Sequence, residues 1–202
     1  MLERVRKLRR ELAFALQLRV LPRRVAWFQW RARRLAARAG DQFSLVSATR
    51  PKKLAVLLHI ARGRRRIVEL GTGTAWTAIS LLLTDRQRSM ATYDPLDRPE
   101  RELYLKLVKP DVRARLAFVQ AFGNAGPQDD ERLVDLLFID SSHSREDTIR
   151  EVEAWRPVLG NGALVVFDDH NHPDYPGVRE AVRELRLEGE ERQGMFVHRV
   201  AG

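Results

Sequence analysis

The sequence of 202 residues has no cysteine and no long apolar run. Without cysteine, disulfide bonds, zinc–thiolate sites and thiol nucleophiles are excluded. No apolar run approaches the roughly 18 residues that a membrane-spanning helix needs. The apolar segment LAFALQL is followed by Arg19, Arg23 and Arg24 and lacks a convincing cleavage site, so we do not expect a secretory signal. Internal repeats and low-complexity linkers are also absent, and the length fits one domain.

Acidic residues are scarce in the first third of the chain. Residues 1–66 contain 19 Lys and Arg against 3 Asp and Glu, a balance of +16, whereas residues 67–202 contain 17 against 24, a balance of −7. The net charge of +9 therefore comes from the N-terminal part. Because a GC-rich genome alone produces a strong preference for arginine over lysine, we interpret the basicity first as composition and only second as a signal for nucleic acid.

From residue 66 onward, short apolar runs alternate with helical patterns. This alternation predicts a parallel sheet covered by helices on both faces. The expected strands are 66–70, 89–94, 115–120, 134–140 and 162–169, and the expected helices are 74–84, 98–108, 145–159 and 177–185. Two final strands around Gln193 and Gly194 would form a hairpin. The predicted fold is thus α/β, a Rossmann-like doubly wound sheet of seven mostly parallel strands with an antiparallel C-terminal hairpin.

The residues before the first strand predict helices. Residues 1–39 form two helical pieces broken near Pro22, with Gly40 as a stop, and a further helix begins after Thr49 and runs to Gly63. In the first piece, apolar residues fall on one face: Leu2, Val5, Leu8, Leu12, Ala15 and Leu16. We divide the chain into a basic helical extension, 1–43, and a catalytic domain, 44–202.

Several roles are open for the basic extension. It can form a lid over the active site or pack on the domain, or it can form a homodimer interface through Trp27, Phe28 and Trp30. Arginine and tryptophan on one amphipathic helix also suit an anionic membrane surface or a nucleic acid.

A glycine turn joins the first expected strand to the helix after it, in the stretch VELGTGTAW. Glycine lets the backbone approach a ligand at such a turn, but this pattern differs from the G-x-G-x-x-G of dinucleotide-binding folds. Glu69, two residues before Gly71, would repel a pyrophosphate and suit the positively charged S-adenosylmethionine (SAM). The second strand ends in Asp94, 23 residues after Gly71, where an acid can accept hydrogen bonds from both ribose hydroxyls.

Residues 66–169 resemble a class I SAM-dependent methyltransferase, and within that superfamily the catechol and caffeoyl-CoA type of O-methyltransferase and related natural-product sugar O-methyltransferases. The resemblance is carried by VELGTGTAWTAISL, TYDP, DLLFIDSSHSREDTIREVEAWRPVL and GALVVFDDH, and SATRPKKLAVLLHIA resembles the helix that precedes the first strand in those enzymes. It covers roughly residues 44–200. One departure is Ala75, where the family usually has glycine.

The resemblance implies SAM as the cofactor and gives a role to each matching residue. Along the methionine part of SAM it would place Glu69, Gly71 and Gly73, with Thr77 reaching the carboxylate, and Thr72 would also belong to the cofactor site. It implies that Asp94 binds the ribose, that Ala121 and Phe122 border the adenine, and that Asp140 and Ser141 lie nearby.

Three carboxylates follow the fourth and fifth strands, namely Asp140, Asp168 and Asp169. Because the carboxyl ends of parallel strands meet at one edge of the sheet, these groups would repel one another unless one pKa is raised or a hard cation lies between them. The catechol-type enzymes use an acid after strand four and an Asp-Asn pair after strand five, so the resemblance implies Mg²⁺ or another divalent cation here. Asp169 replaces the usual asparagine, which leaves room for the metal to be absent. Helix capping and loop ion pairs are the alternative roles.

His143 lies three residues after Asp140, at the offset where the catechol-type family has a lysine base. An imidazole suits proton abstraction near neutral pH, although SSHSRED is also a good helix-capping sequence. His170 and His172 follow the aspartate pair, and either can contact substrate or metal, with His170 the favoured one and a solvent-facing loop as the alternative for both.

Together these observations predict an enzyme, a SAM-dependent methyltransferase that methylates a hydroxyl of a small molecule with help from a divalent metal. The catalytic residues would be His143, Asp140 and His170. A nucleic-acid (RNA) methyltransferase that uses the basic N-terminus is one alternative, and a non-catalytic cofactor-binding scaffold is another. We expect a cytoplasmic protein, with peripheral membrane contact through the basic helices as a further option.

Overall fold

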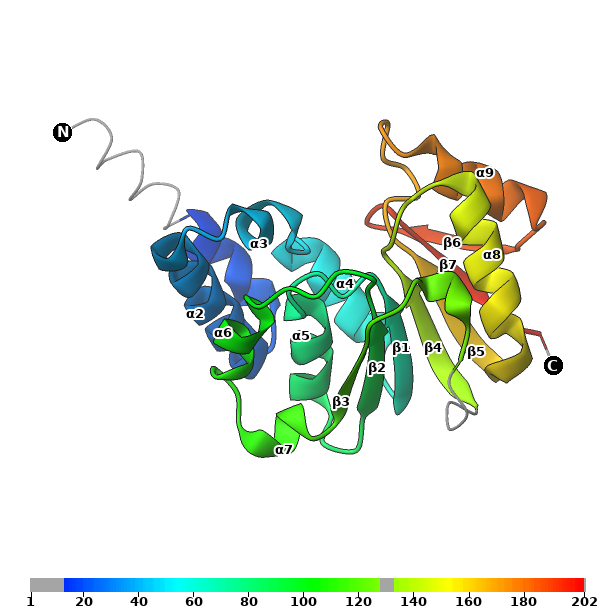
Figure 1. Ribbon diagram of the computed structural model, residues 1–202. Coiled ribbons are helices and arrows are strands. Elements are labelled where there is room, and N and C mark those ends of the chain that lie inside the picture. Colours follow the sequence, from blue (N-terminus) through cyan, green and yellow to red (C-terminus); the bar gives the residue numbers. More distant parts are fainter. Residues whose placement is uncertain (1–12, 128–132, 202) are drawn as a thin grey trace.

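The computed structural model describes residues 13–127 and 133–201 (Figure 1). Its strands are β1 (Arg66–Leu70), β2 (Ser89–Tyr93), β3 (Leu116–Val119), β4 (Val134–Ile139), β5 (Leu159–Phe167), β6 (Gly189–Arg192) and β7 (Met195–Arg199). Its α-helices are α2 (Arg23–Ala39), α3 (Gln42–Ser47), α4 (Pro51–Ile60), α5 (Trp76–Thr84), α6 (Arg101–Leu105), α7 (Pro110–Arg113), α8 (Arg145–Trp155) and α9 (Pro176–Glu184). Short 3₁₀ helices cover Leu18–Val20 (η1), Gly123–Ala125 (η2) and Arg156–Val158 (η3).

The strands form one seven-stranded sheet in the order β3-β2-β1-β4-β5-β7-β6. The first five strands are parallel, and β7 runs antiparallel to both β5 and β6. The predicted doubly wound sheet with an antiparallel C-terminal hairpin is confirmed. The register places Leu70 opposite both Tyr93 and Ile139, and Ile139 opposite Phe167, so neighbouring strands end level with one another. The residues that follow each strand therefore meet at one edge of the sheet.

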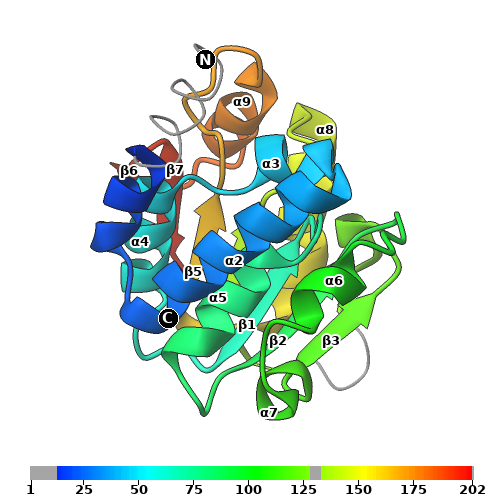
Figure 2. The same cartoon turned by 90° about the vertical axis from the view of Figure 1, so that its left-hand side faces the viewer.

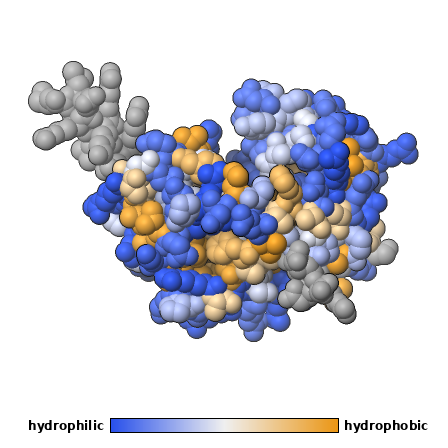
Figure 3. Space-filling model, in the orientation of Figure 1, coloured by the Kyte–Doolittle hydropathy of each residue, from blue (hydrophilic) through white to orange (hydrophobic). Residues whose placement is uncertain are grey.

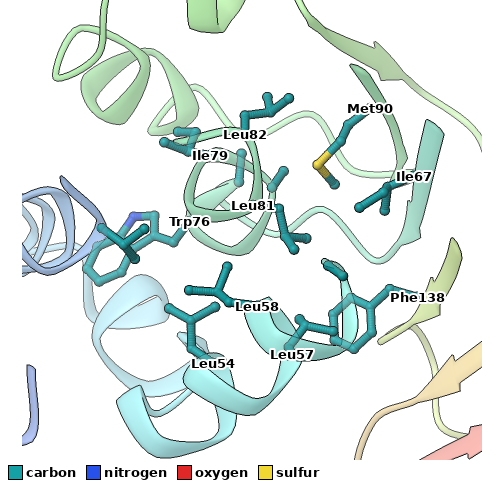
Figure 4. Packing of buried hydrophobic residues seen from close by; sticks show 14 of the residues in the cluster. Leu54, Leu57, Leu58, Ile67, Trp76, Ile79, Leu81, Leu82, Met90 and Phe138 are labelled. Atoms are coloured by element: carbon teal, nitrogen blue, oxygen red, sulfur yellow. The ribbon is translucent and has the colours of Figure 1, made fainter. Parts of the chain in front are cut away.

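Helices cover both faces of the sheet, with α2, α4 and α5 on one side and α8 and α9 on the other (Figures 1 and 2). The period-2 alternation of strand side chains sends neighbours to opposite faces. Ile67, for example, belongs to the core beneath α4 and α5, whereas Val68 belongs to the core beneath α8 and α9. In the first core, side chains of α4, α5, β1, β2 and β4 interlock (Figure 4).

The N-terminal helices follow the sequence pattern within the described residues. Residues 13–17 are helical, the chain breaks at Leu21 and Pro22, and α2 ends at Gly40, which has a left-handed backbone with φ of 72°. The predicted apolar face of residues 1–12 lies outside the described residues. Phe28 is buried in the core that α2 shares with α5, whereas Trp27 and Trp30 are exposed. Arg31 and Arg34 lie over the rings of these two tryptophans.

The α2 helix thus packs on the domain, and its roles toward a second copy, a membrane or a nucleic acid stay predictions, as does the division of the chain at residues 43 and 44. No helix in the described part of the chain combines the length and apolar character that crossing a bilayer demands.

Two local differences from the sequence prediction have physical causes. The expected helix 98–108 is reduced to α6, and Pro110 opens the separate helix α7. Helix α3 was not predicted, because its six residues are too few to show a helical period. It is started by Asp41, whose Oδ1 accepts a hydrogen bond from the Ser44 backbone N–H at 2.9 Å.

Candidate functional site

A cavity of about 1260 Å³ opens at the edge of the sheet where the parallel strands end. The space-filling view is notched along its upper edge, between the part that carries α3 and the part that carries α8 and α9 (Figure 3). The cavity walls include most of the predicted site residues, which are Gly71, Thr72, Gly73, Thr77, Asp94, Phe122, Asp140, Ser141, His143, Asp168 and Asp169. Glu69, Ala121 and His170 do not line it. We call the part around Gly71, Gly73 and Asp94 the glycine end, and the part around Asp140, His143, Asp168 and Asp169 the carboxylate end.

Glycine is required at position 71 because the loops after β1 and β4 approach each other closely there. Gly71 has φ of 97°, and a Cβ at this position would lie 1.9 Å from the backbone oxygen of Asp140. Its own N–H donates to the Tyr93 carbonyl at 2.8 Å. Ala75, two residues after Gly73, also has a positive φ, 67°, which explains why glycine suits this position better.

Asp94 ties the glycine loop to the segment after β2. Its Oδ2 accepts from the Gly73 N–H at 2.9 Å and lies 3.3 Å from a guanidinium nitrogen of Arg101, while its Oδ1 accepts from the Leu96 N–H at 2.9 Å. A carboxylate offers about four lone-pair sites, so Asp94 retains acceptor capacity toward the cavity that it lines.

Glu69 lies beneath the glycine loop, with only 1% of its surface exposed. Its Oε2 accepts a hydrogen bond from Thr92 Oγ1 at 2.7 Å, and the Thr92 hydroxyl also lies 2.7 Å from that of Thr72. Burial, opposed in part by the Thr92 hydrogen bond, raises the pKa of Glu69 to about 8. Glu69 is therefore connected to the glycine loop through the Thr92 hydroxyl, which bridges it to Thr72. Thr72 in turn lines the cavity.

The cavity lining also includes a buried acid that was not predicted from the sequence. Glu151 of α8 is 3% exposed and accepts a hydrogen bond from Ser141 Oγ at 2.7 Å. Burial raises its pKa to about 7, against the lowering effect of the Ser141 hydrogen bond. Phe122 is 66% exposed at the cavity rim, whereas the predicted neighbour Ala121 packs against the core beneath α8.

The carboxylate end does not match the predicted metal site. The Lys53 ammonium of α4 lies 2.7 Å from Asp168 Oδ1 and 2.7 Å from Asp169 Oδ1. Within residues 13–127 and 133–201, no three His, Cys, Asp or Glu side chains are arranged to hold a metal ion. This geometry does not support the expectation that Asp140, Asp168 and Asp169 jointly ligate a divalent cation, because an ammonium already lies against two of these carboxylates.

His143 lies where the sequence places it, beside Asp140. Its Nε2 is 3.4 Å from Asp140 Oδ1 and 3.7 Å from Asp169 Oδ2, and it has no hydrogen-bond partner in the described part of the chain. Its ring stacks on Tyr175, with centroids 4.6 Å apart. Burial lowers the pKa of His143, but the surrounding carboxylates, Asp140 first, raise it more, so the net shift is upward.

Two residues at this end of the cavity have an unusual backbone conformation. His143 has φ of 58° and Asp169 has φ of 50°, both in the left-handed region that side chains other than glycine rarely adopt. Burial, followed by the charge of Asp168, raises the pKa of Asp140 above its ordinary value. Strained backbone and shifted pKa values together are typical of functional sites.

His170, which the sequence analysis placed among the catalytic residues, does not line this cavity. It is 7% exposed and lines a separate pocket of about 580 Å³. There its Nδ1 lies 2.9 Å from Glu191 Oε1 and its ring stacks on Phe196. His172, by contrast, lines the main cavity.

The sequence reasoning missed Lys53, Glu151 and Tyr175, all of which line the cavity. Lys53 stands beside Lys52 at the start of the helix predicted after Thr49, directly before an apolar run, and that position was the available signal. Glu151 gave a similar signal within the helical pattern of residues 145–159.

Comparison with known proteins identifies the family to which this sequence belongs. A family model described as "Methyltransferase domain" matches residues 68–170, just over half of the chain. A search of functionally curated proteins gave no match.

Solved structures share the fold at low sequence identity. The O-methyltransferase TomG from Streptomyces achromogenes, involved in tomaymycin synthesis and solved with SAM, aligns with a TM-score of 0.65 and 20% identity over 85% of this chain and 88% of that chain. An O-methyltransferase from Bacillus cereus in complex with S-adenosylhomocysteine aligns with a TM-score of 0.64 and 14% identity over 83% of this chain and 88% of that chain. CalS11, a TDP-rhamnose 3′-O-methyltransferase in calicheamicin biosynthesis, aligns with a TM-score of 0.58 and 18% identity over 73% of this chain and 77% of that chain. At these low sequence identities, the structural similarity establishes the shared fold alone.

Proposed function

The chain belongs to the methyltransferase-domain family, and we propose that it transfers the methyl group of SAM to a hydroxyl oxygen of a small molecule. The observation that supports this most strongly is the cavity itself, in which a glycine loop with an acid after β2 faces a histidine flanked by carboxylates after β4 and β5. One end suits a nucleoside and the other suits removal of a proton.

The residues at the glycine end fit SAM. Asp94 has free acceptor capacity for ribose hydroxyls. The first turn of α5 carries backbone N–H groups without intrahelical acceptors, which favour an anion such as the carboxylate of the methionine part. The Thr77 hydroxyl, 3.0 Å from that of Thr49, lies on the same turn and lines the cavity.

At the carboxylate end the chain can accept a proton. When bound, SAM supplies an electrophilic methyl group on a sulfonium. His143 Nε2, which has no hydrogen-bond partner within the described residues, would take the proton from the acceptor hydroxyl. Asp140 and Asp169 would then stabilise the resulting imidazolium. Tyr175, stacked on the ring, would help to hold the imidazole in place. No metal-assisted step belongs to this proposal, because Lys53 already pairs with two of the three carboxylates.

The proposal is tested by incubating the protein with methyl-labelled SAM and a panel of catechols, nucleotide sugars and hydroxylated polyketides, with unmodified RNA as a separate arm. We expect label in at least one small hydroxyl compound and none in RNA. Label in RNA alone would replace the proposal with a nucleic-acid methyltransferase. Cofactor binding with no labelled product in any arm would favour a non-catalytic role.

A further inference from the structure

Lys53 holds an unusual position among the charged residues of the cavity. It comes from α4, before the first strand, and reaches the carboxylates that follow β5, 115 and 116 residues later. Only 19% of its side chain is exposed, and those of Asp168 and Asp169 are 7% and 23% exposed. An ammonium held this way is part of the site and not a solvated surface charge.

The contacts of Lys53 leave one hydrogen free. An ammonium has three N–H donors, and Asp168 Oδ1 and Asp169 Oδ1 accept two of them. No third acceptor is present within residues 13–127 and 133–201, and Lys53 lines the cavity. The remaining donor is therefore available to an oxygen atom of a bound molecule.

Asp169 connects Lys53 to the proposed base. Its Oδ1 accepts from Lys53, and its Oδ2 faces His143 Nε2 at 3.7 Å. A group held by Lys53 would thus lie close to the imidazole that takes its proton. A dication placed between Asp168 and Asp169 would have to displace the ammonium or be repelled by it.

We propose that Lys53 is the resident cation of the carboxylate end: it occupies the position that a divalent ion would need, and it donates its remaining hydrogen to the acceptor oxygen. The second half of this statement rests on the proposed function, whereas the first half does not. Methyl transfer would then proceed equally well with EDTA and with Mg²⁺.

The experiment compares Lys53→Met, which keeps most of the side-chain length and removes the charge, with Lys52→Met, the exposed neighbour on the same helix. Lys53→Gln serves as a second variant, and thermal unfolding identifies any variant that does not fold. Each protein is titrated with Mn²⁺, followed by the electron paramagnetic resonance signal of the free ion. Binding of S-adenosylhomocysteine (SAH) is measured in parallel.

We expect the wild type and Lys52→Met to leave the free Mn²⁺ signal unchanged up to roughly 1 mM, whereas Lys53→Met binds the ion at least about tenfold more tightly. Adding Asp168→Asn to Lys53→Met should abolish the gained binding. With an acceptor identified in the labelled-SAM panel, the wild-type rate should not respond to EDTA, and Lys53→Met should lose about tenfold or more in rate.

Tight Mn²⁺ binding by the wild type that Asp168→Asn removes would overturn the inference, and so would folded Lys53 variants that gain no Mn²⁺ binding. Either result leaves the proposed function intact as long as SAH binds. Absence of SAH binding by the folded wild type would instead remove the proposed function, whatever the Mn²⁺ result.

Discussion

The two ends of the cavity satisfy their polar groups by different means. At the glycine end, the carboxylate of Asp94 accepts from the backbone N–H groups of Gly73 and Leu96. At the carboxylate end, Asp168 and Asp169 pair with a lysine side chain from a distant helix. The first end is therefore held mainly by backbone hydrogen bonds between the loops after β1 and β2, whereas the second depends on a side-chain ion pair with α4, more than a hundred residues away in the chain. Substitutions at the two ends should consequently separate binding from chemistry.

The largest effect is expected for Gly71→Ala. The new Cβ would meet the Asp140 backbone oxygen at 1.9 Å, so the loops after β1 and β4 would have to move apart. We expect a loss of roughly 3 kcal/mol or more in unfolding free energy, together with loss of SAH binding. Thermal unfolding and calorimetry measure both.

Gly40→Ala is the matched control, because Gly40 also has a positive φ, 72°, but nothing lies within 4 Å of its Cβ position. It should cost only about 1–2 kcal/mol for the left-handed backbone and leave SAH binding unchanged. Equal destabilisation by both substitutions would show that glycine is needed at position 71 for its left-handed backbone and not for the close approach of the Asp140 backbone oxygen.

His143→Asn should abolish chemistry while sparing the cofactor. Asparagine tolerates the left-handed backbone at this position, so the fold should be retained. We expect kcat to fall about 10²- to 10⁴-fold, with the Kd for SAH changed less than about threefold. In the wild type, kcat should decrease as the pH falls through the pKa of His143, which lies above the usual 6.5, because the base must be neutral. A wild-type profile that stays flat there, or a variant with full activity, would exclude His143 as the base.

Asp94→Asn should give the opposite pattern. A hydrogen bond to a charged partner is worth about 1.5–3 kcal/mol, so we expect the Kd for SAH to rise about 10- to 100-fold. At saturating SAM, kcat should change little, since the carboxylate end is intact. Unchanged SAH affinity in the calorimeter would mean that Asp94 serves only to hold Gly73 and Leu96.

The smallest effect concerns Glu69 and the pH dependence of stability. The pKa of Glu69 is about 8 in the folded protein and about 4.5 when unfolded, so the folded state binds more protons between these values. The Tm of the ligand-free protein should therefore fall by several degrees from pH 5.5 to pH 8, at about 2–4 °C per kcal/mol for a chain of this size.

Glu69→Gln should weaken this slope, because the amide has no proton to lose, and Glu180→Gln on the exposed face of α9 should not. Part of the slope should persist, since Glu151 and Asp140 also have raised pKa values. A slope as steep in Glu69→Gln as in the wild type would refute the protonated state of Glu69.

The sequence correctly predicted which residues come together when each of them directly follows a strand. Gly71, Asp94, Asp140 and Asp168 directly follow four strands whose ends the register aligns, so strand boundaries sufficed to bring them together. It failed where side-chain direction depends on packing. His170 follows the same strand as Asp168 but turns toward Glu191 and Phe196. Lys53 was missed because its partners lie more than a hundred residues away, and the metal prediction was therefore made without the ammonium that pairs with Asp168 and Asp169.

The most direct test of this account is a calorimetric titration of the purified wild-type protein with SAH, performed once with EDTA and once with excess Mg²⁺. The cavity predicts micromolar binding of the same strength under both conditions, since the glycine end is complete and Lys53 supplies the positive charge at the other end. A folded protein that binds no SAH under either condition would contradict it.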